Sequence, residues 1–352
     1  MPLDHYVTLG RSGLRVSPFC LGAMTFGEEW GFGSGERAST EILDYFVGQG
    51  GNFVDTANLY NKGHSESILG EYFTRDAARR QRLVLATKFS ANMTPGDPNG
   101  GGANRKSIIA ACEASLRRLR TDYIDLYWQH WEDPFTPVEE TMQALDSLVT
   151  AGKVRYIGFS DTHAWKVAAA QLTAQFRGWT PLVALQIEYS LLERTVEGEL
   201  IPMAQALGLG VTPWGPLRSG VLSGKYKRGN MTAVSQGRAP WVARNDTEFA
   251  HGVLDVLAIV ASRRGTTPAR IALAWLRSRP GVTSPILGAR TLEQLKDNLA
   301  SLELQLAPED VEELDRVSAP RFNFPTAFLE NATAQCYAGL TVNGMKFGPS
   351  PR

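Results

Sequence analysis

Four side chains that exchange protons readily stand at or near the ends of short apolar segments. Asp55, Lys88 and His130 each close or follow such a segment. Tyr60 comes five residues after Asp55. A phenol with a pKa of about 10 is a poor acid at neutral pH, but a nearby ammonium favours its ionised form. Lys88 could supply that charge, Asp55 could hold Lys88 in place, and His130 could hydrogen-bond a substrate oxygen. The set predicts a site where Tyr60 donates a proton.

Taken singly, each of these residues has an ordinary structural explanation. Asp55 could cap a turn, and Tyr60 could be a half-buried ring. Lys88 could lie at the surface, and His130 could be a satisfied core histidine. Further polar or aromatic residues also follow apolar segments, namely Ser160, Gln186 and Trp214. The carboxyl ends of the parallel strands of a barrel share one rim, where active sites are assembled, so we expect all of these residues on one face.

The elements that must position these residues alternate between short apolar runs and stretches of helical period, which is typical of βαβ units with a parallel sheet. The predicted strands are Phe19–Gly22, Phe53–Asp55, Leu83–Thr87, Ile124–Trp128, Tyr156–Gly158, Val183–Gln186, Gly210–Thr212 and Thr283–Ile286. The predicted helices are Glu36–Gln49, Ser65–Phe73, Arg105–Arg118, Pro137–Val149, Ala164–Gln175, Gly198–Ala206, Pro268–Arg277 and Leu292–Ser301. Thr136 and Thr267 each place a capping hydroxyl before a proline that would begin a helix.

We therefore expect a single α/β domain over residues 1–352, a (β/α)8 TIM barrel with an N-terminal β-hairpin and a long loop after the seventh strand. The hairpin would pair Tyr6–Leu9 with Leu14–Val16 and close the barrel floor. The segment between Trp214 and His251 is much longer than an ordinary connection and is rich in Gly, Ser, Arg and Pro. Loops of this length in compact domains are usually functional, so the segment predicts a lid.

Composition narrows the classes of partner. Lys plus Arg number 36 and Asp plus Glu number 36, so no net charge draws the chain to nucleic acid or to an anionic membrane. No apolar run approaches the ~18 residues of a membrane span, and Asp4 and His5 interrupt any apolar signal peptide. Cys20, Cys112 and Cys336 are too scattered for a disulfide framework or a metal site. We expect a cytoplasmic protein with a small-molecule partner and no metal, and a homo-oligomer stays open.

Three segments carry a resemblance to a known family: NFVDTANLYNKGHSESILG, VLATKF and LYWQHWEDPFTPVEE. From about Leu9 to Leu304, the chain resembles aldo-keto reductases. The resemblance implies that the four proton-transfer residues form a catalytic tetrad and that NADPH lies extended across the barrel rim. No GxGxxG motif follows a predicted strand, so the Rossmann fingerprint is absent. The oxidoreductase interpretation therefore rests on the barrel site.

The same resemblance implies which residues bind each part of the cofactor. Ser160, Asp161 and Gln186 would bind the nicotinamide carboxamide, although the family usually has Asn where this chain has Asp161. Trp214 would stack on the nicotinamide. The residues implied along the diphosphate are Gly215, Pro216, Leu217, Ser219 and Lys225, with Arg238 added if the long loop folds over the cofactor. The residues implied at the adenosine and its 2′-phosphate are Gly288, Arg290, Gln294, Asp297 and Asn298. Arg290 favours NADPH over NADH.

The expected reaction is reduction of an aldehyde or ketone to an alcohol, with Tyr60 as the proton donor. Candidates for an apolar substrate wall are Met24, Phe26, Trp30, Phe89 and Trp131, with Trp241 and Phe324 as further contributors. Their character suggests a hydrophobic or aromatic carbonyl compound. Two alternatives stay open. The sequence is also similar to the reductase-like β subunits of potassium channels, where NADPH can be a redox-sensing ligand, and a barrel alone permits a lyase or hydrolase.

Overall fold

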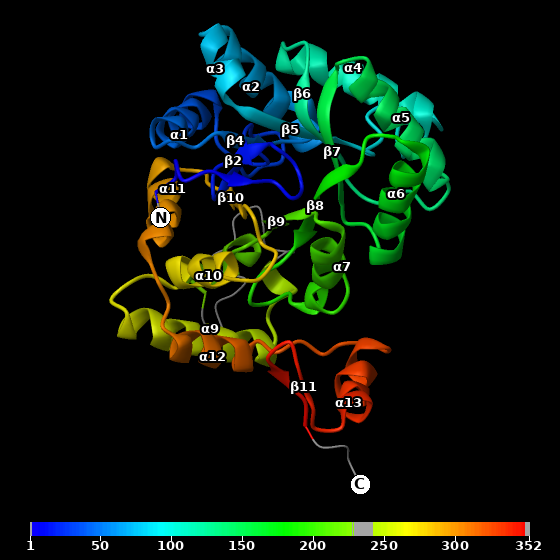
Figure 1. Cartoon of the computed structure of the whole chain (residues 1–352). Helices are drawn as coiled ribbons and strands as arrows, with labels where there is room; N and C mark the ends of the chain where they lie inside the picture. The colour runs from blue at the N-terminus through cyan, green and yellow to red at the C-terminus, as the bar shows by residue number, and fades with distance from the viewer. Residues whose placement is uncertain (1, 227, 229–241, 349–352) are drawn as a thin grey trace.

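The computed structural model describes residues 2–226, 228 and 242–348, which form a barrel of parallel strands surrounded by helices (Figure 1). The eight barrel strands are β3 (Cys20–Gly22), β4 (Phe53–Asp55), β5 (Val84–Phe89), β6 (Ile124–Gln129), β7 (Val154–Ser160), β8 (Leu182–Glu188), β9 (Gly210–Trp214) and β10 (Ile286–Gly288). Strands adjacent in the chain pair in parallel from β3 to β9, and β10 pairs with β3. A bridge between Val211 and Val282 nearly closes the ring. The predicted TIM barrel is confirmed.

The eighth strand begins later than predicted. The sequence predicts Thr283–Ile286, whereas β10 begins at Ile286. The backbone N–H of Thr283 donates to Val211 O at 2.8 Å, so the residues ahead of β10 bond to β9 instead. Pro285 has no N–H to continue that pairing, and the chain then pairs with β3.

Helices separate the strands and cover the outside of the barrel. Those before β10 are α1 (Glu36–Gly48), α2 (His64–Thr74), α3 (Ala77–Arg82), α4 (Arg105–Leu119), α5 (Val138–Thr150), α6 (Ala164–Arg177), α7 (Leu200–Leu207), α9 (Glu248–Arg263) and α10 (Pro268–Arg277). Those after β10 are α11 (Leu292–Leu299), α12 (Pro308–Val317) and α13 (Thr326–Tyr337). Short 3₁₀ segments are η1 (Tyr60–Gly63), η2 (Thr195–Glu197), η3 (Arg218–Ser223) and η4 (Ala300–Glu303).

The two predicted helix caps have different outcomes. Thr267 accepts a hydrogen bond from the backbone N–H of Arg270, and α10 begins at Pro268, as predicted. The prediction for Thr136 is wrong, because α5 begins at Val138 and the Thr136 hydroxyl donates to Asp133 at 2.7 Å. A nearby carboxylate therefore takes the hydroxyl that would otherwise have capped the helix.

The predicted amino-terminal hairpin is present and lies against the amino ends of barrel strands. Its strands are β1 (Val7–Thr8) and β2 (Arg15–Val16). Gly10, with φ +58°, lies so close to this floor that a Cβ would stand 2.3 Å from Val183 O and 2.6 Å from Gly210 N. Only glycine fits such a close approach, and the hairpin therefore seals this end of the barrel.

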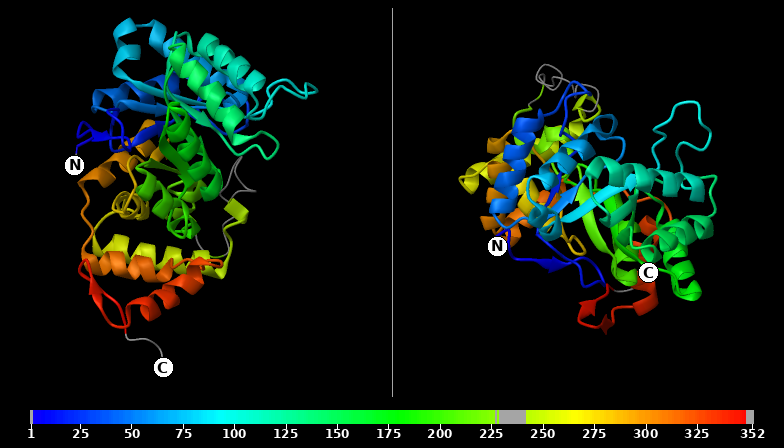
Figure 2. Two further views of the ribbon diagram at one scale, coloured as in Figure 1. Left: turned by 45° about the vertical axis from the view of Figure 1, so that its right-hand side comes forward. Right: turned by 90° about the horizontal axis from the view of Figure 1, so that it is seen from above.

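The expected lid falls mainly on residues 227 and 229–241, which lie outside the described residues together with Arg238 and Trp241. The described part of this connection contains η3, and α9 is the first long helix after it. Beyond β10, α12 packs beside α9, and the chain ends in α13 and a small hairpin of β11 (Thr341–Val342) and β12 (Met345–Lys346). Figure 2 shows this segment, coloured orange to red, at one end of the molecule.

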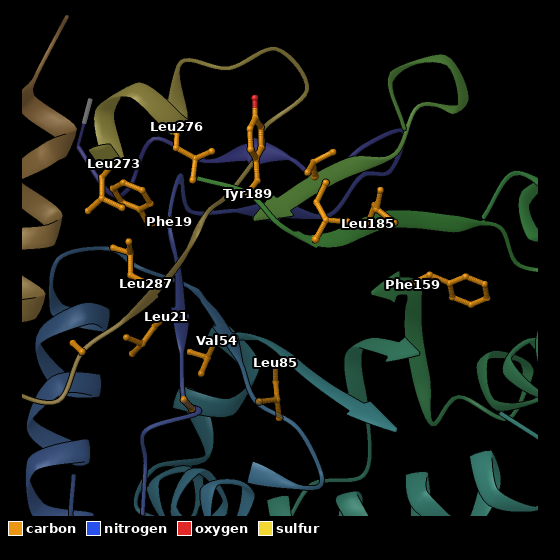
Figure 3. Close-up of a cluster of buried hydrophobic side chains, with 14 of the residues drawn as sticks. Phe19, Leu21, Val54, Leu85, Phe159, Leu185, Tyr189, Leu273, Leu276 and Leu287 are labelled. Carbon is orange, nitrogen blue, oxygen red and sulfur yellow. The ribbon is translucent and has the colours of Figure 1, made fainter. Parts of the chain in front are cut away.

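Side chains alternate along each strand between the barrel interior and the helix layer. Leu21, Val54 and Leu85 belong to the large cluster between strands and helices, which also contains Leu273 and Leu276 of α10 (Figure 3). A smaller cluster fills the interior, and its fully buried members are Leu9, Val16, Cys20, Phe53, Ala86, Leu126, Trp128 and Ala184. The interior near the floor is therefore apolar and closely packed.

Packing in the barrel interior predicts a strong effect at Gly158 of β7. A Cβ there would lie 2.4 Å from the Trp128 ring and 2.8 Å from Ala184 O. Because neither neighbour has room to move, Gly158→Ala should lower the free energy of unfolding by about 1–3 kcal/mol in urea denaturation. The matched control is Gly48→Ala in α1, where nothing lies within 4 Å and the helix should gain about 0.5–1 kcal/mol. Equal stability of the two variants would contradict this packing argument.

Candidate active site

On β4, β5 and β6, the side chains on the inward face become polar at or just beyond the carboxyl end. On β4, Asp55 follows the inward Phe53, and on β5, Lys88 follows the inward Ala86. His130 continues the inward series of β6 beyond Trp128. A period of two along a strand thus carries side chains from the apolar interior to the rim. The predicted convergence of these residues is present.

Lys88 is the centre of the hydrogen-bond network. Its side chain is fully buried, and its ammonium forms an ion pair with Asp55. The same ammonium donates to Thr56 O at 2.8 Å and to Tyr60 Oη at 3.2 Å. Gln186 Nε2 donates to the other oxygen of Asp55 at 3.0 Å. The pair therefore meets the condition that a buried charge be both paired and hydrogen-bonded.

A tight turn presents Tyr60 to the site. Asn61 and Lys62 have φ values of +47° and +59°, in the left-handed region. The Asn61 side chain holds this turn, because its Nδ2 donates to Met24 O at 3.1 Å and to Phe26 O at 2.9 Å. The Tyr60 ring then meets the His130 ring edge-on, with centroids 5.7 Å apart. Sequence reasoning did not identify Asn61 as the anchor of this turn.

Burial and charge act against each other in this network. Burial alone would lower the pKa of Lys88, but the charge of Asp55 and the hydrogen bonds to Asp55 and Tyr60 outweigh it and raise that pKa, so the amine stays protonated. Burial raises the pKa of Tyr60 above its usual value, and Lys88 opposes this without reversing it. The Tyr60 phenol is therefore a weaker acid than a free phenol, which corrects the expectation that Lys88 would make it a stronger one. Tyr60 carries its proton at neutral pH.

His130 is electrically neutral. Burial, and then the Lys88 ammonium, lower the pKa of His130 to about 2. Its Nδ1 has no hydrogen-bond partner in the part of the chain that the structure describes. A neutral imidazole has one N–H to donate and one nitrogen to accept with, so His130 can bind a substrate oxygen without a charge of its own.

One cavity of about 1050 Å³ runs from this network along the rim. Tyr60, His130 and Asp55 line it, and so do Arg290 and Asn298 from the segment that follows β10. The residues expected at the nicotinamide, diphosphate and adenosine that line the cavity are Ser160, Asp161, Gln186, Trp214, Gly215, Pro216, Leu217, Ser219, Lys225, Gly288, Arg290, Gln294, Asp297 and Asn298. The fold therefore gathers residues from the ends of β4, β6, β7, β8, β9 and β10 and from α11 into one site.

The expected substrate wall is only partly present. Met24, Trp30 and Trp131 line the cavity. Phe26 and Phe89 are fully buried and absent from its lining, which corrects their expected place. Phe89 follows the inward Lys88 directly, so it faces the helix layer, where its ring packs 5.0 Å from that of Tyr127. Phe324 is 83% exposed and lies outside the lining.

Sequence reasoning missed a polar link across the cavity. Arg218 of η3 forms an ion pair with Glu188 at the end of β8. Arg218 Nε also donates to Asn245 Oδ1 at 3.0 Å, and Asn245 lies in the segment that leads to α9. These three residues and Arg244 all line the cavity. No local motif connects residues so far apart in the chain, so only the folded geometry identifies the link.

Asp161 and Trp214 form a second unexpected contact. Trp214 Nε1 donates to Asp161 Oδ1 at 2.9 Å. Burial raises the pKa of Asp161 to about 6, while the hydrogen bond from Trp214 acts against that rise. The indole therefore has a defined orientation at the cavity wall.

The fold and the lined cavity define a TIM barrel with a candidate active site at the carboxyl ends of its strands. The chain belongs to the aldo/keto reductase family, whose model matches residues 18–319. It is 40% identical over 314 residues to the uncharacterized oxidoreductase YrpG of Bacillus subtilis, covering 87% of this chain and 93% of the relative. It is 39% identical over 342 residues to the norsolorinic acid reductase stcV of Emericella nidulans, covering 95% and 86%. An aryl-alcohol dehydrogenase of Pestalotiopsis microspora is 36% identical over 332 residues, covering 92% and 85%.

Within residues 2–226, 228 and 242–348, none of the helices is long and apolar enough to cross a membrane. Nor do these residues contain a group of three or more His, Cys, Asp or Glu side chains placed to hold a metal ion.

The low pKa of His130 predicts a pH dependence of stability. An unfolded chain protonates a histidine below about pH 6.5, whereas folded His130 stays neutral down to about pH 2. The unfolded state therefore binds more protons below pH 6.5, and the free energy of unfolding falls by up to about 1.4 kcal/mol per pH unit. His130→Gln should lose less stability between pH 6.5 and 5 than the wild type in urea denaturation. The exposed His5→Gln is the control, and parallel curves for His130→Gln and wild type would contradict neutral burial.

Proposed function

We propose that this protein is an NADPH-dependent reductase of aldehydes or ketones, with Tyr60 as the general acid. The observation that carries the proposal is the hydroxyl of Tyr60, 3.2 Å from a buried ammonium and at the wall of an elongated cavity. Family membership supports the oxidoreductase class. Cytoplasmic location and any self-association stay predictions.

The cavity suits an extended dinucleotide. Its lining offers an indole and neutral amides near Tyr60, and Lys225 and Arg290 farther along, which match a nicotinamide at one end and phosphates beyond it. Gly215 and Gly220 also line the cavity and have φ values of +66° and +88°, so the backbone can approach a ligand closely there. Arg290 precedes the amino terminus of α11, where partial positive charge favours a 2′-phosphate. These residues would hold NADPH.

The chemistry then follows from the position of each side chain. When bound, NADPH would supply a hydride to the carbonyl carbon. Tyr60 Oη gives its proton to the carbonyl oxygen, which completes the two-electron reduction to an alcohol. The Lys88 ammonium stabilises the phenolate left on Tyr60, and Asp55 keeps that ammonium in place. The neutral His130 imidazole orients the substrate oxygen.

The substrate class follows from the wall beside Tyr60. Met24, Trp30, Leu59 and Trp131 give this end of the cavity an apolar and aromatic lining. Such a lining suits a flat, hydrophobic carbonyl compound. Relatives named for norsolorinic acid reduction and for aryl-alcohol dehydrogenation support an aromatic substrate. We therefore propose aromatic aldehydes and ketones.

The first test removes the hydroxyl of Tyr60. Tyr60→Phe should lower NADPH-dependent reduction of an aromatic aldehyde by about 10²–10⁴-fold, because the alkoxide loses its proton donor. The dissociation constant for NADPH, measured by fluorescence titration, should stay within about twofold. Tyr72→Phe is the matched control, since the Tyr72 hydroxyl bonds to Asp44 outside the cavity. Full turnover by Tyr60→Phe would refute the assignment, and NADPH binding by a wild type without turnover would favour a regulatory role.

The second test concerns the choice of cofactor. Arg290→Ala should weaken NADPH binding by about tenfold or more and leave NADH binding nearly unchanged, because a charge-assisted bond to the 2′-phosphate is lost. Arg37→Ala, at an exposed arginine paired with Glu41, is the control for removing one positive charge. Equal weakening of both cofactors would rule out this role for Arg290.

A further inference from the structure

Asp161 places a carboxylate at the wall of the cavity, near the proton-transfer group. It follows β7 directly, and its backbone N–H donates to Gln186 O at 3.2 Å on β8. Its Oδ1 accepts the hydrogen bond from Trp214 Nε1 at the end of β9. Asp161 and Tyr60 line the same cavity, and the charge of Asp161 acts to raise the pKa of Tyr60. The carboxylate is therefore held within electrostatic reach of the reacting end.

The charge of Asp161 has no cation of its own. Across residues 2–226, 228 and 242–348, no salt bridge includes it. The nearby ammonium of Lys88 is paired with Asp55, and the nearby Glu188 is paired with a guanidinium. The hydrogen-bond donor Trp214 is neutral. Any positive charge that a ligand brings to this end of the cavity would meet an unneutralised carboxylate.

The proposed reaction changes a charge at this end of the cavity. In the reduction, a C–H bond of the nicotinamide ring would break and its electron pair would pass as a hydride to the carbonyl carbon, while the O–H bond of Tyr60 breaks and its proton goes to the carbonyl oxygen. The carbonyl compound would become an alcohol, and NADPH would become NADP⁺. The nicotinamide ring is positively charged in NADP⁺ and neutral in NADPH. A nearby carboxylate stabilises the charged ring and has less effect on the neutral one.

We propose that Asp161 strengthens the binding of NADP⁺ relative to NADPH and so shifts the equilibrium on the enzyme toward NADP⁺ and the alcohol, that is, toward reduction of the carbonyl compound. The proposal rests on the function proposed above, because it requires a nicotinamide beside Tyr60. A ligand in the cavity excludes water from the carboxylate, which increases the electrostatic difference between the two forms. Trp214 and Asp161 thus have separate roles, since the indole supplies a surface and the carboxylate supplies the charge.

Titration of Asp161 in the wild type gives a second way to change the same charge. With a pKa of about 6, Asp161 is ionised at pH 8 and mostly protonated at pH 5. Charged and titratable groups near it are Lys88 from β5, Tyr60 from η1, and Glu188 from β8 with its partner Arg218 from η3. From the segment after β6, the backbone N–H of Glu132 donates to Asp161 O at 3.4 Å, and the Glu132 carboxylate is paired with Lys166 and His163. The 2′-phosphate is common to NADP⁺ and NADPH, so its titration largely cancels in the ratio of their dissociation constants.

The experiment measures dissociation constants for NADP⁺ and NADPH by isothermal titration calorimetry. Asp161→Asn removes the charge, keeps an oxygen that can accept from Trp214, and suits the local φ of +41° because Asn tolerates the left-handed region. At pH 8 this variant should weaken NADP⁺ relative to NADPH by about tenfold. Asp297→Asn is the matched control, since it removes a carboxylate from the α11 side of the cavity and should change both constants by the same factor.

The outcomes separate the two proposals. A ratio of dissociation constants that stays the same in Asp161→Asn, with both forms still bound, would overturn the role of Asp161 and leave the proposed function intact. A wild type that binds neither form would overturn both. If Asp161→Asn fails to fold, the wild type decides. Its ratio should shift toward NADPH between pH 8 and pH 5, and a ratio independent of pH would overturn the proposal.

Discussion

The ion pair between Lys88 and Asp55 is the interaction on which the rest of the site depends. Burying two charges is costly unless they are paired and fully hydrogen-bonded, and here Thr56 O, Tyr60 Oη and Gln186 Nε2 complete the bonding. These groups come from the ends of β4, β5 and β8 and from η1. A shift of one residue in the register of β4, β5 or β8 would turn Asp55, Lys88 or Gln186 away from the rim and toward the helices. The chemistry of the rim therefore requires the observed strand register.

Most of the fold was predictable because its signal is periodic. Apolar runs alternating with helical stretches indicated each barrel strand, and residues at the strand ends indicated the rim. The eighth strand was misplaced because pairing changes from β9 to β3 within one apolar run, and no local pattern marks that change. The prediction for Phe89 was wrong for a reason the sequence already contained: a residue next to an inward lysine must point outward.

Interactions between distant residues could not be predicted in the same way. The link of Arg218 with Glu188 and Asn245, and the contact of Trp214 with Asp161, join separate rim loops and have no sequence signature. The direction of the Tyr60 pKa was also out of reach, because the spacing of residues shows which charges are near but not how completely the ring is removed from water. Burial is a property of the whole fold, whereas a charged neighbour can be expected from a motif.

The two ends of the barrel differ in how well they can tolerate amino-acid substitutions, and the amino-terminal hairpin closes the less tolerant end. At the floor, Gly10 stands against the backbone of Val183 and Gly210, where even a methyl group has no space. At the opposite end, the side chains that line the cavity come largely from strand ends and connecting loops, and few of them belong to the apolar interior cluster. Specificity can consequently diverge through changes in the rim loops while the sealed end preserves the folded state, which gives such a scaffold its capacity to acquire new substrates.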